Sequence, residues 1–206
     1  MATVLLTGFT PFADFSQNPS QQIAEALSGT RIAGHVVESA VLPVEFGRDV
    51  ELLFPLIERL QPRLVLSLGL AATAPCIWVE RIALNLRQTN EGERPIIAGG
   101  PPALFARLPT DAVARSICDV GVPAVAHVFA GTYLCNHIMY QVLHQIERKT
   151  APRQAGFLHL PLSVEQALAE GRMQSSALPL SHLEKGVHAA IASILQAPVD
   201  GGQFGQ

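Results

Sequence analysis

A continuous apolar run from Leu64 to Leu70 constrains the fold of this chain more than any other feature. Five of its seven residues are Leu or Val, with only Ser67 and Gly69 between them, and such a run without charged residues is typical of a parallel strand buried on both faces. Similar short runs lie at Val4 to Thr7, Ala124 to Phe129 and Ala155 to Leu160, and helical patterns separate them. Because parallel strands need long crossover connections, this alternation predicts an α/β protein, a three-layer α/β/α sandwich around a mostly parallel, mixed sheet.

The predicted helices are marked by caps and by apolar residues at helical spacing. Residues between Val50 and Leu60 form one apolar face, and another helix runs from about Thr132 to Arg148. The segments His35 to Val44 and Ile77 to Leu86 are expected to be further strands. Four cap signals are expected to begin helices, namely Asn18 before Pro19, Thr110, Ser163, and a capping box from Ser181 to Glu184.

The length of 206 residues is ordinary for one domain, and no linker or repeat interrupts the chain. We therefore expect a single domain over residues 1–206, with a frayed tail from about residue 197, where Pro and Gly accumulate. The hydrophobic fraction of 49% with only 15% charged residues excludes intrinsic disorder. Little charge is available to cover the surface, which favours a homo-oligomer.

The formal net charge is −3 and no run of Lys or Arg occurs, so neither nucleic acid nor a membrane surface is an expected partner. The stretch from Val120 to Ile146 lacks charged residues and is long enough to span a bilayer. It contains Pro123 and Gly131, however, and its hydrophobic period changes halfway, which predicts a buried strand followed by a buried helix. With no signal-like segment at the start and no CxxC pair among three cysteines, we expect a cytoplasmic protein with reduced thiols.

Functional residues of such sheets gather beyond the carboxyl ends of the strands, and Cys135 lies in such a place. It follows a predicted strand and falls in the first turn of an apolar helix, where the helix dipole favours a thiolate. The alternative is a small core residue. Cys118 lies in the last turn of a helix and Cys76 follows Pro75 in a loop, so neither is a comparable nucleophile.

A cysteine nucleophile needs a base, and seven histidines compete for that role. His159 ends a predicted strand, where the sheet would present a base, although a histidine there is more often structural. Glu80 lies within an apolar segment and could orient the base, or it could simply pair with the adjacent Arg81. Together Cys135, His159 and Glu80 fit the nucleophile, base and orienter of thiol acyl transfer.

Other chemistries lack their motifs. The sequence has no Walker loop, no GxGxxG, no GxSxG elbow, no HExxH and no cluster of acidic residues for a divalent ion. We therefore expect no metal site and no nucleotide cofactor.

Four motifs resemble those of the pyrrolidone carboxyl peptidase (pyroglutamyl peptidase I) family. The match runs in order over nearly the whole chain, from Val4 to about His188, and the cysteine motif is the most specific. The motifs are VLLTGFTPF from Val4 to Phe12 with Asn18-Pro19-Ser20, ERIALN from Glu80 to Asn85, AGTYLCNH from Ala130 to His137, and GFLHLP from Gly156 to Pro161.

The resemblance implies a cysteine exopeptidase that removes an N-terminal pyroglutamyl residue from peptides. It also implies no cofactor, a cytoplasmic setting and a homo-oligomer, usually a tetramer. By motif position, Cys135 would be the nucleophile, His159 the base and acid, and Glu80 the orienter. Phe9 and Phe12 would line the pocket for the lactam ring.

The sequence departs from the family pattern at three places. The loop Gly69-Leu70-Ala71-Ala72-Thr73-Ala74 stands where relatives usually have Gly-Gln-Ala-Gly-Gly-Arg. Thr10 stands where they usually have Asp, and the segment after Asn85 is shorter than theirs. We predict a preformed pocket around Phe9, Phe12 and Leu70 that holds pyroglutamate mainly through main-chain hydrogen bonds. Two alternatives remain open, another thiol amidase of the glutamine amidohydrolase type and a non-catalytic pyroglutamyl binder.

Overall fold

A computed structural model describes residues 3–89, 92–148 and 154–197. Within these ranges the chain forms an eight-stranded mixed sheet with helices on both faces, which confirms the predicted fold class. The strand order is β2-β3-β1-β4-β10-β5-β8, and β9 pairs with β5. Apart from Ala197, the tail predicted to fray lies outside the described residues.

Parallel pairing dominates the centre of the sheet. β1 pairs in parallel with β3 and β4, β10 with β4, and β9 with β5, whereas β5 runs antiparallel to β10 and β8. The strands of this sheet are β1 (Thr3–Phe9), β2 (Arg31–Ile32), β3 (His35–Leu42), β4 (Leu64–Leu70), β5 (Ile77–Leu84), β8 (Ala103–Phe105), β9 (Ala124–Phe129) and β10 (Gln154–Leu160).

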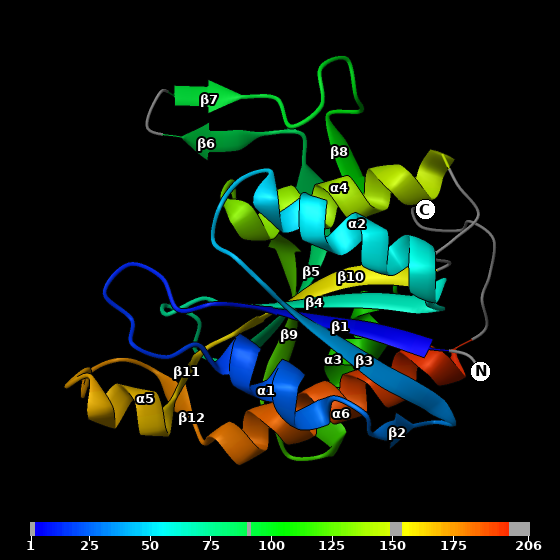
Figure 1. The fold of residues 1–206 in the computed structure, drawn as a ribbon. Helices are drawn as coiled ribbons and strands as arrows, with labels where there is room; N and C mark the ends of the chain where they lie inside the picture. Colours follow the sequence, from blue (N-terminus) through cyan, green and yellow to red (C-terminus); the bar gives the residue numbers. More distant parts are fainter. Residues whose placement is uncertain (1–2, 90–91, 149–153, 198–206) are drawn as a thin grey trace.

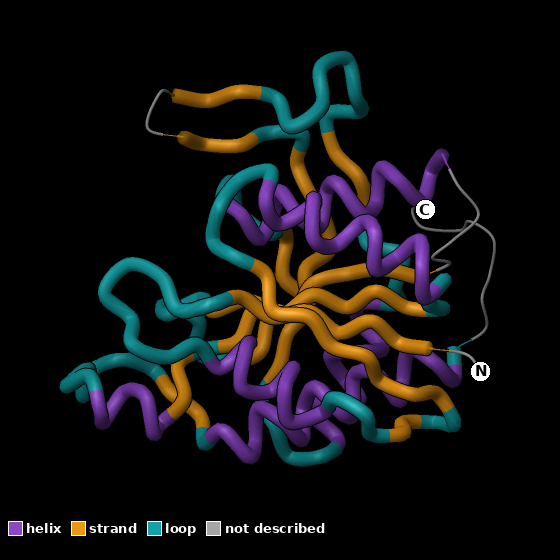
Figure 2. The backbone as a smooth tube through the Cα atoms, in the orientation of Figure 1, coloured by secondary structure: helices purple, strands orange, loops and turns teal. Residues whose placement is uncertain are grey.

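The helices form two layers, one on each face of the sheet (Figures 1 and 2). α2 (Arg48–Leu60) and α4 (Leu134–Arg148) cover one face. α1 (Pro19–Leu27), α3 (Thr110–Asp119) and α6 (Leu180–Gln196) cover the other. The short helix α5 (Val164–Ala169) lies beside a small sheet of β11 (Leu162–Ser163) and β12 (Ala177–Leu178), at the edge of the second layer.

Each face of the sheet has its own hydrophobic core, because successive side chains of a strand point to opposite faces. On β4, Leu64, Leu66 and Leu68 pack with α1 and α6, whereas Val65 packs on the side of α2 and α4. Every residue of β4 and of β10 is buried. The strand predicted from its continuous apolar run is therefore central, as expected.

β9 differs from its prediction as a buried strand. It lies at the margin of the sheet, and Val125, Val128 and Phe129 are exposed. An apolar run indicates that a strand forms, but it does not show which strand occupies an edge. The part of the chain from Arg87 to Arg94 adds a small hairpin, β6 (Arg87–Thr89) and β7 (Gly92–Arg94), which the sequence analysis did not anticipate and which projects from the sheet (Figure 1).

Two predicted caps are wrong. α3 begins at Thr110 itself, with Pro109 in the cap position, and α6 begins at Leu180, so the expected capping box of Ser181 does not form. Instead, the backbone N–H of Leu180 donates to the Glu165 carboxylate on α5, at 3.1 Å. A tertiary contact thus replaces the local cap. The caps Asn18 and Ser163 are confirmed.

The uncharged stretch from Val120 to Ile146 forms β9 and most of α4, so the predicted strand followed by a helix is confirmed, whereas the predicted burial of the strand is wrong. Within the described ranges, no helix is long and apolar enough to cross a membrane.

Candidate active site

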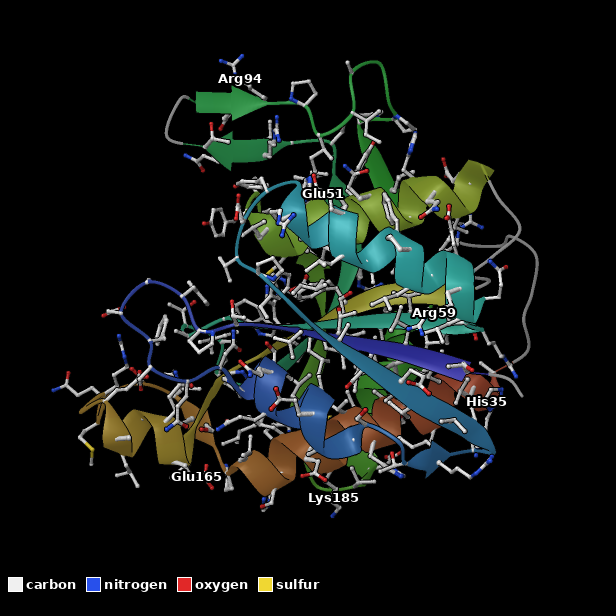
Figure 3. All side chains as sticks on the ribbon, in the orientation of Figure 1. His35, Glu51, Arg59, Arg94, Glu165 and Lys185 are labelled. Carbon is white, nitrogen blue, oxygen red and sulfur yellow. The ribbon has the colours of Figure 1, made fainter. Side chains whose placement is uncertain are left out.

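One pocket of about 360 Å³ opens beside the carboxyl ends of β1, β4 and β10. Most charged side chains of the molecule lie on its surface, as do those labelled on α2, β7, α5 and α6 in Figure 3. The Glu80 side chain at the pocket is an exception, because it is fully buried. The lining includes Phe9, Phe12, Leu70, Glu80, Cys135 and His159. All six residues predicted from the sequence to form the site therefore meet at one place.

Cys135 is the second residue of α4, and it is reached through a turn after β9. Gly131 has a φ of 79° in that turn, a backbone conformation that glycine adopts without strain. The next residue, Asn136, is buried and its side chain bonds to both the N–H and the C=O of Leu84 and to the C=O of Leu86, at 2.7 to 2.9 Å. These three bonds fix the first turn of α4 against the end of β5.

Gly69, at the end of β4, leaves the space in which the sulfur atom of Cys135 lies. A Cβ atom built at this position would be 2.9 Å from Cys135 Sγ and 2.7 Å from Cζ of the fully buried Phe157. The nucleophile candidate thus depends on a glycine on a neighbouring strand.

His159 and Glu80 form a buried pair. His159 Nδ1 lies 2.6 Å from Glu80 Oε1, and the register of β10 and β5 places His159 opposite Trp78, two residues from Glu80. Cys135 lines the same pocket, and its charge acts on the imidazole. The sulfur atom, the imidazole and the carboxylate therefore gather at one place in the pocket.

The charges of the site favour a protonated imidazole. Burial by itself would lower the pKa of His159, because it disfavours the charged imidazole. The pKa nevertheless rises from 6.5 to about 10, because the negative charges of Cys135 and Glu80 and hydrogen bonding to these groups favour the charged form. An imidazolium in turn stabilises a thiolate at Cys135. This arrangement can supply both a sulfur nucleophile and an acid.

Glu80 has a second imidazole partner, His127 on β9. His127 Nδ1 lies 2.9 Å from Glu80 Oε2, and the two residues are paired in the register of β5 and β9. Arg81, the alternative partner considered for Glu80, points to the other face and pairs with Asp111 on α3. The acid is therefore held by two histidines and not by its neighbour in sequence.

The loop after β1 carries the aromatic part of the pocket. The backbone N–H of Phe9 donates to Ser20 Oγ at 3.0 Å, and Asn18 Nδ2 donates to the C=O of Thr10 at 3.2 Å. Phe12 packs against Phe15, with ring centroids 5.3 Å apart. Asn18 and Ser20, at the start of α1, thus hold this loop in place through hydrogen bonds.

A second anchor joins the same loop to the segment after α5. The Glu170 carboxylate accepts from the backbone N–H and the hydroxyl of Ser16, and these bonds help to lower the pKa of Glu170 despite its desolvation by burial. Arg172 pairs with Asp14 and lies over the Phe15 ring at 4.3 Å. The loop is thereby tied at both of its ends.

The loop from Leu70 to Ala74 is closed by main-chain hydrogen bonds. The N–H of Ala71 donates to the C=O of Leu160 at 2.8 Å, and the N–H of Ala74 donates to the C=O of Ala71 at 2.9 Å. The Leu70 side chain is nearly buried and contributes an apolar wall to the pocket.

The other cysteines lie outside the pocket. Burial raises the pKa of the Cys76 thiol, and the nearby Cys118 raises it further. Cys118 is exposed, and its thiol donates to the C=O of Ala124. Neither has the imidazole partner that Cys135 has among the contacts of the described residues.

The competing histidines make other contacts. His137 is buried and bonds to Asp49 on α2 at 2.7 Å, so it ties two helices together. His144 stacks on Tyr140, His35 bonds to the C=O of Ala33, and His182 and His188 are exposed on α6. Within the described ranges, no group of three or more His, Cys, Asp and Glu residues could hold a metal ion.

Comparison with known proteins identifies the family. The family model for pyroglutamyl peptidase matches residues 2–197. The chain belongs to the pyroglutamyl peptidase family. A pyrrolidone-carboxylate peptidase of Klebsiella pneumoniae is 40% identical over 208 residues, covering 97% of this chain and 96% of that protein. One of Cupriavidus taiwanensis is 38% identical over 217 residues, covering 99% and 100%. The pyroglutamyl peptidase family consists of cysteine peptidases, so this chain is a hydrolase.

Solved structures of the same family agree with the fold. The pyrrolidone carboxyl peptidase of Pyrococcus furiosus superposes with a TM-score of 0.89 at 34% identity, covering 94% of this chain and 98% of that one. The enzyme of Thermococcus litoralis gives 0.87 at 34% identity, with coverage of 95% and 94%. The pyroglutamyl peptidase fold is thus shared over nearly the whole length.

Sequence reasoning missed three residues of the site. His127 was placed only inside a strand, because the pairing of β9 with β5 cannot be deduced from either segment alone. Gly69 was noted as part of a loop motif, without its contact to Cys135. Asn136 was quoted only as part of the cysteine motif. A polar residue in the first turn of an apolar helix was the available sequence signal, because a polar side chain that becomes buried needs hydrogen-bond partners.

Proposed function

We propose that this protein hydrolyses the amide bond that follows an N-terminal pyroglutamyl residue of peptides, with Cys135, His159 and Glu80 as the catalytic group. The observation that carries this proposal is the connected arrangement of the three side chains at the wall of the pocket. The family supports the same reaction.

The reaction begins at the sulfur atom. The Cys135 thiolate attacks the carbonyl carbon of the pyroglutamyl residue and forms a C–S bond. The carbonyl oxygen becomes an oxyanion near the first turn of α4, where backbone N–H groups have no partner within the helix and the dipole favours negative charge.

The leaving group departs with a proton from His159. The C–N bond breaks as the His159 imidazolium protonates the amine, which leaves a thioester on Cys135. Water then attacks the thioester carbonyl carbon and forms a C–O bond, while His159 takes its proton. The C–S bond breaks, which releases pyroglutamate and restores the Cys135 thiolate beside the His159 imidazolium. Glu80 keeps the Nδ1 side of the imidazole oriented through both steps.

The pocket suits a small, flat and uncharged lactam ring. Phe9, Phe12 and Leu70 provide apolar walls, and the two loops that carry them are held in place by hydrogen bonds. We propose that main-chain groups satisfy the lactam N–H and C=O, because an apolar wall cannot replace a hydrogen bond.

The test is turnover of a pyroglutamyl chromogenic amide by the wild type and by cysteine variants. Cys135→Ser should fold normally and lose turnover by about 10³-fold or more, since a hydroxyl is far less ionised than a thiol. Cys118→Ser is the matched control, because this thiol is exposed and remote from the pocket, and it should keep wild-type turnover. A Cys135→Ser enzyme with full activity would contradict the mechanism.

The same preparation separates the two alternatives. Release of amine from a glutamine amide, without release from the pyroglutamyl amide, would indicate a glutamine amidohydrolase. A protein that binds pyroglutamate without turnover of either amide, and whose Cys135 reacts slowly with a thiol alkylator, would indicate a binder.

We also propose a cytoplasmic homo-oligomer, a tetramer by resemblance to the family, in which each chain is one domain. Exposed apolar side chains support association, namely Val125, Val128 and Phe129 on β9, Tyr133 shortly after it, and Phe105 on β8. Light scattering on the purified protein measures the mass directly.

A further inference from the structure

We propose that His127 is a positioning residue for Glu80, and that a proton gained by His127 weakens the hold of Glu80 on His159. This inference rests on the proposed function, because it concerns the same catalytic group. Its basis is that one buried carboxylate is shared by two imidazoles from two different strands.

Because Glu80 is buried, each of its two carboxylate oxygens needs a hydrogen-bond donor from the protein, and His127 is one of these donors. The Glu80 side chain is fully buried, and His159 bonds to only one of its two oxygens. The second oxygen, Oε2, bonds to His127. Without His127, a charged oxygen would be left in a buried place without this donor, which is costly and would allow the carboxylate to rotate away from His159.

The ring of His127 is held in one plane. It stacks on Trp78 with centroids 4.2 Å apart and an interplanar angle of 9°, and its Nδ1 then points at Glu80. Trp78 also meets His159 edge-on, with centroids 6.4 Å apart. The orientation of the carboxylate therefore depends on a donor that is itself positioned by packing.

The charges around His127 define what its protonation does. Glu80 on β5, His159 on β10 and Cys135 on α4 line the same pocket as His127. On the other face of β5, Arg81 and Asp111 of α3 neutralise each other, and the Cys118 thiol of α3 bonds to the C=O of Ala124 at the start of β9. A second positive charge on His127 would compete with His159 for the single carboxylate.

Solvent can supply that proton. The His127 side chain is 31% exposed, whereas the side chain of His159 is 10% exposed and that of Glu80 is 0% exposed. His127 thus connects the buried catalytic group to the pH of the surrounding water.

Two variants separate the donor from the charge. His127→Phe keeps an aromatic ring for Trp78 and removes the donor, and it should lower kcat about tenfold or more with KM changed less than about threefold. His127→Asn keeps a donor that cannot become charged, so it should retain more of kcat than His127→Phe and lose less activity on the acid side of the pH profile. His188→Asn, at an exposed position on α6, is the matched control and should behave as wild type.

NMR titration gives a readout that does not require turnover. In the wild type, the ring resonances of His159 should shift at the pH at which His127 gains its proton, and this step should be absent from both His127 variants. The inference is overturned if His127→Phe keeps the wild-type kcat and pH profile, or if the His159 resonances of the wild type show no such step. A wild type without turnover would instead overturn the proposed function, and the titration would still decide the coupling.

Discussion

At the scale of single residues, the site is defined by where charge is buried. Glu80 is an acid in an apolar strand, and such a residue needs partners that the strand itself does not supply. Cys135, His159 and Glu80 could be chosen from the sequence because each type has a distinct chemical role and a distinct place at the end or middle of an element. His127 could not, because its role follows from strand pairing.

The titration of His159 should respond to its carboxylate partner. Its pKa is about 10 with Glu80 and Cys135 in place. Glu80→Gln removes a negative charge beside the imidazolium, so the charged form becomes less favourable and the pKa of His159 should fall. NMR titration of the imidazole measures this directly. Turnover should fall as well, by less than the about 10⁴-fold cost of losing the corresponding acid in serine proteases. An unchanged pKa and an unchanged rate would remove Glu80 from the mechanism.

Gly69 should be as necessary as the residues that react. Gly69→Ala places a methyl group against Cys135 Sγ and Phe157, and because Phe157 is buried the sulfur atom must shift. A misplacement of about 1 Å can cost about 10²-fold in rate, so kcat should fall by at least that order. The measurement is kcat together with thermal unfolding.

Gly156→Ala provides the comparison for the Gly69 variant. Its methyl group would meet the side chain of Leu108 on the opposite face of the sheet, away from the pocket. It should lower stability while the folded enzyme keeps its kcat. If Gly69→Ala behaved in the same way as Gly156→Ala, the contact with Cys135 would have no catalytic meaning.

At the scale of elements, the sequence predicted which helices and strands exist better than it predicted the residues at which they begin and end. β4 was predicted from Leu64 to Leu70 and has those bounds, because Pro62 and Arg63 precede the apolar run and the small residues Ala71 and Ala72 follow it. The start of α6 was missed, since its first N–H is satisfied by Glu165 from another helix. The β6 and β7 hairpin was missed because its strands are short and exposed, so they carry no apolar pattern.

The loop from Leu70 to Ala74 gives the prediction at this scale. Two main-chain bonds close the loop without help from any other group, so crystal structures with and without pyroglutamate should show it in the same conformation. Leu70→Gln, which restores the usual family residue, should change KM by less than about threefold, because main-chain groups already satisfy the lactam. A lactam held chiefly by side-chain donors, or a loop that rearranges around the ligand, would show the prediction to be wrong.

At the scale of the whole molecule, alternating strands and helices were sufficient to predict the layers but not the order of the strands. The pairing of β5 with both β10 and β9 brings Glu80 between two histidines that are far apart in the sequence. Pairing over such separations depends on the complete packing of both cores, which no local pattern contains.

The strand order also determines when the sheet can be completed during synthesis of the chain. β10 is the last strand of the main sheet to leave the ribosome, yet it fills a central position between β4 and β5. Until it does, the chain has neither His159 nor a joined sheet. Under the proposed mechanism, a growing chain that already carries the Cys135 thiol has no peptidase activity until the sheet is complete.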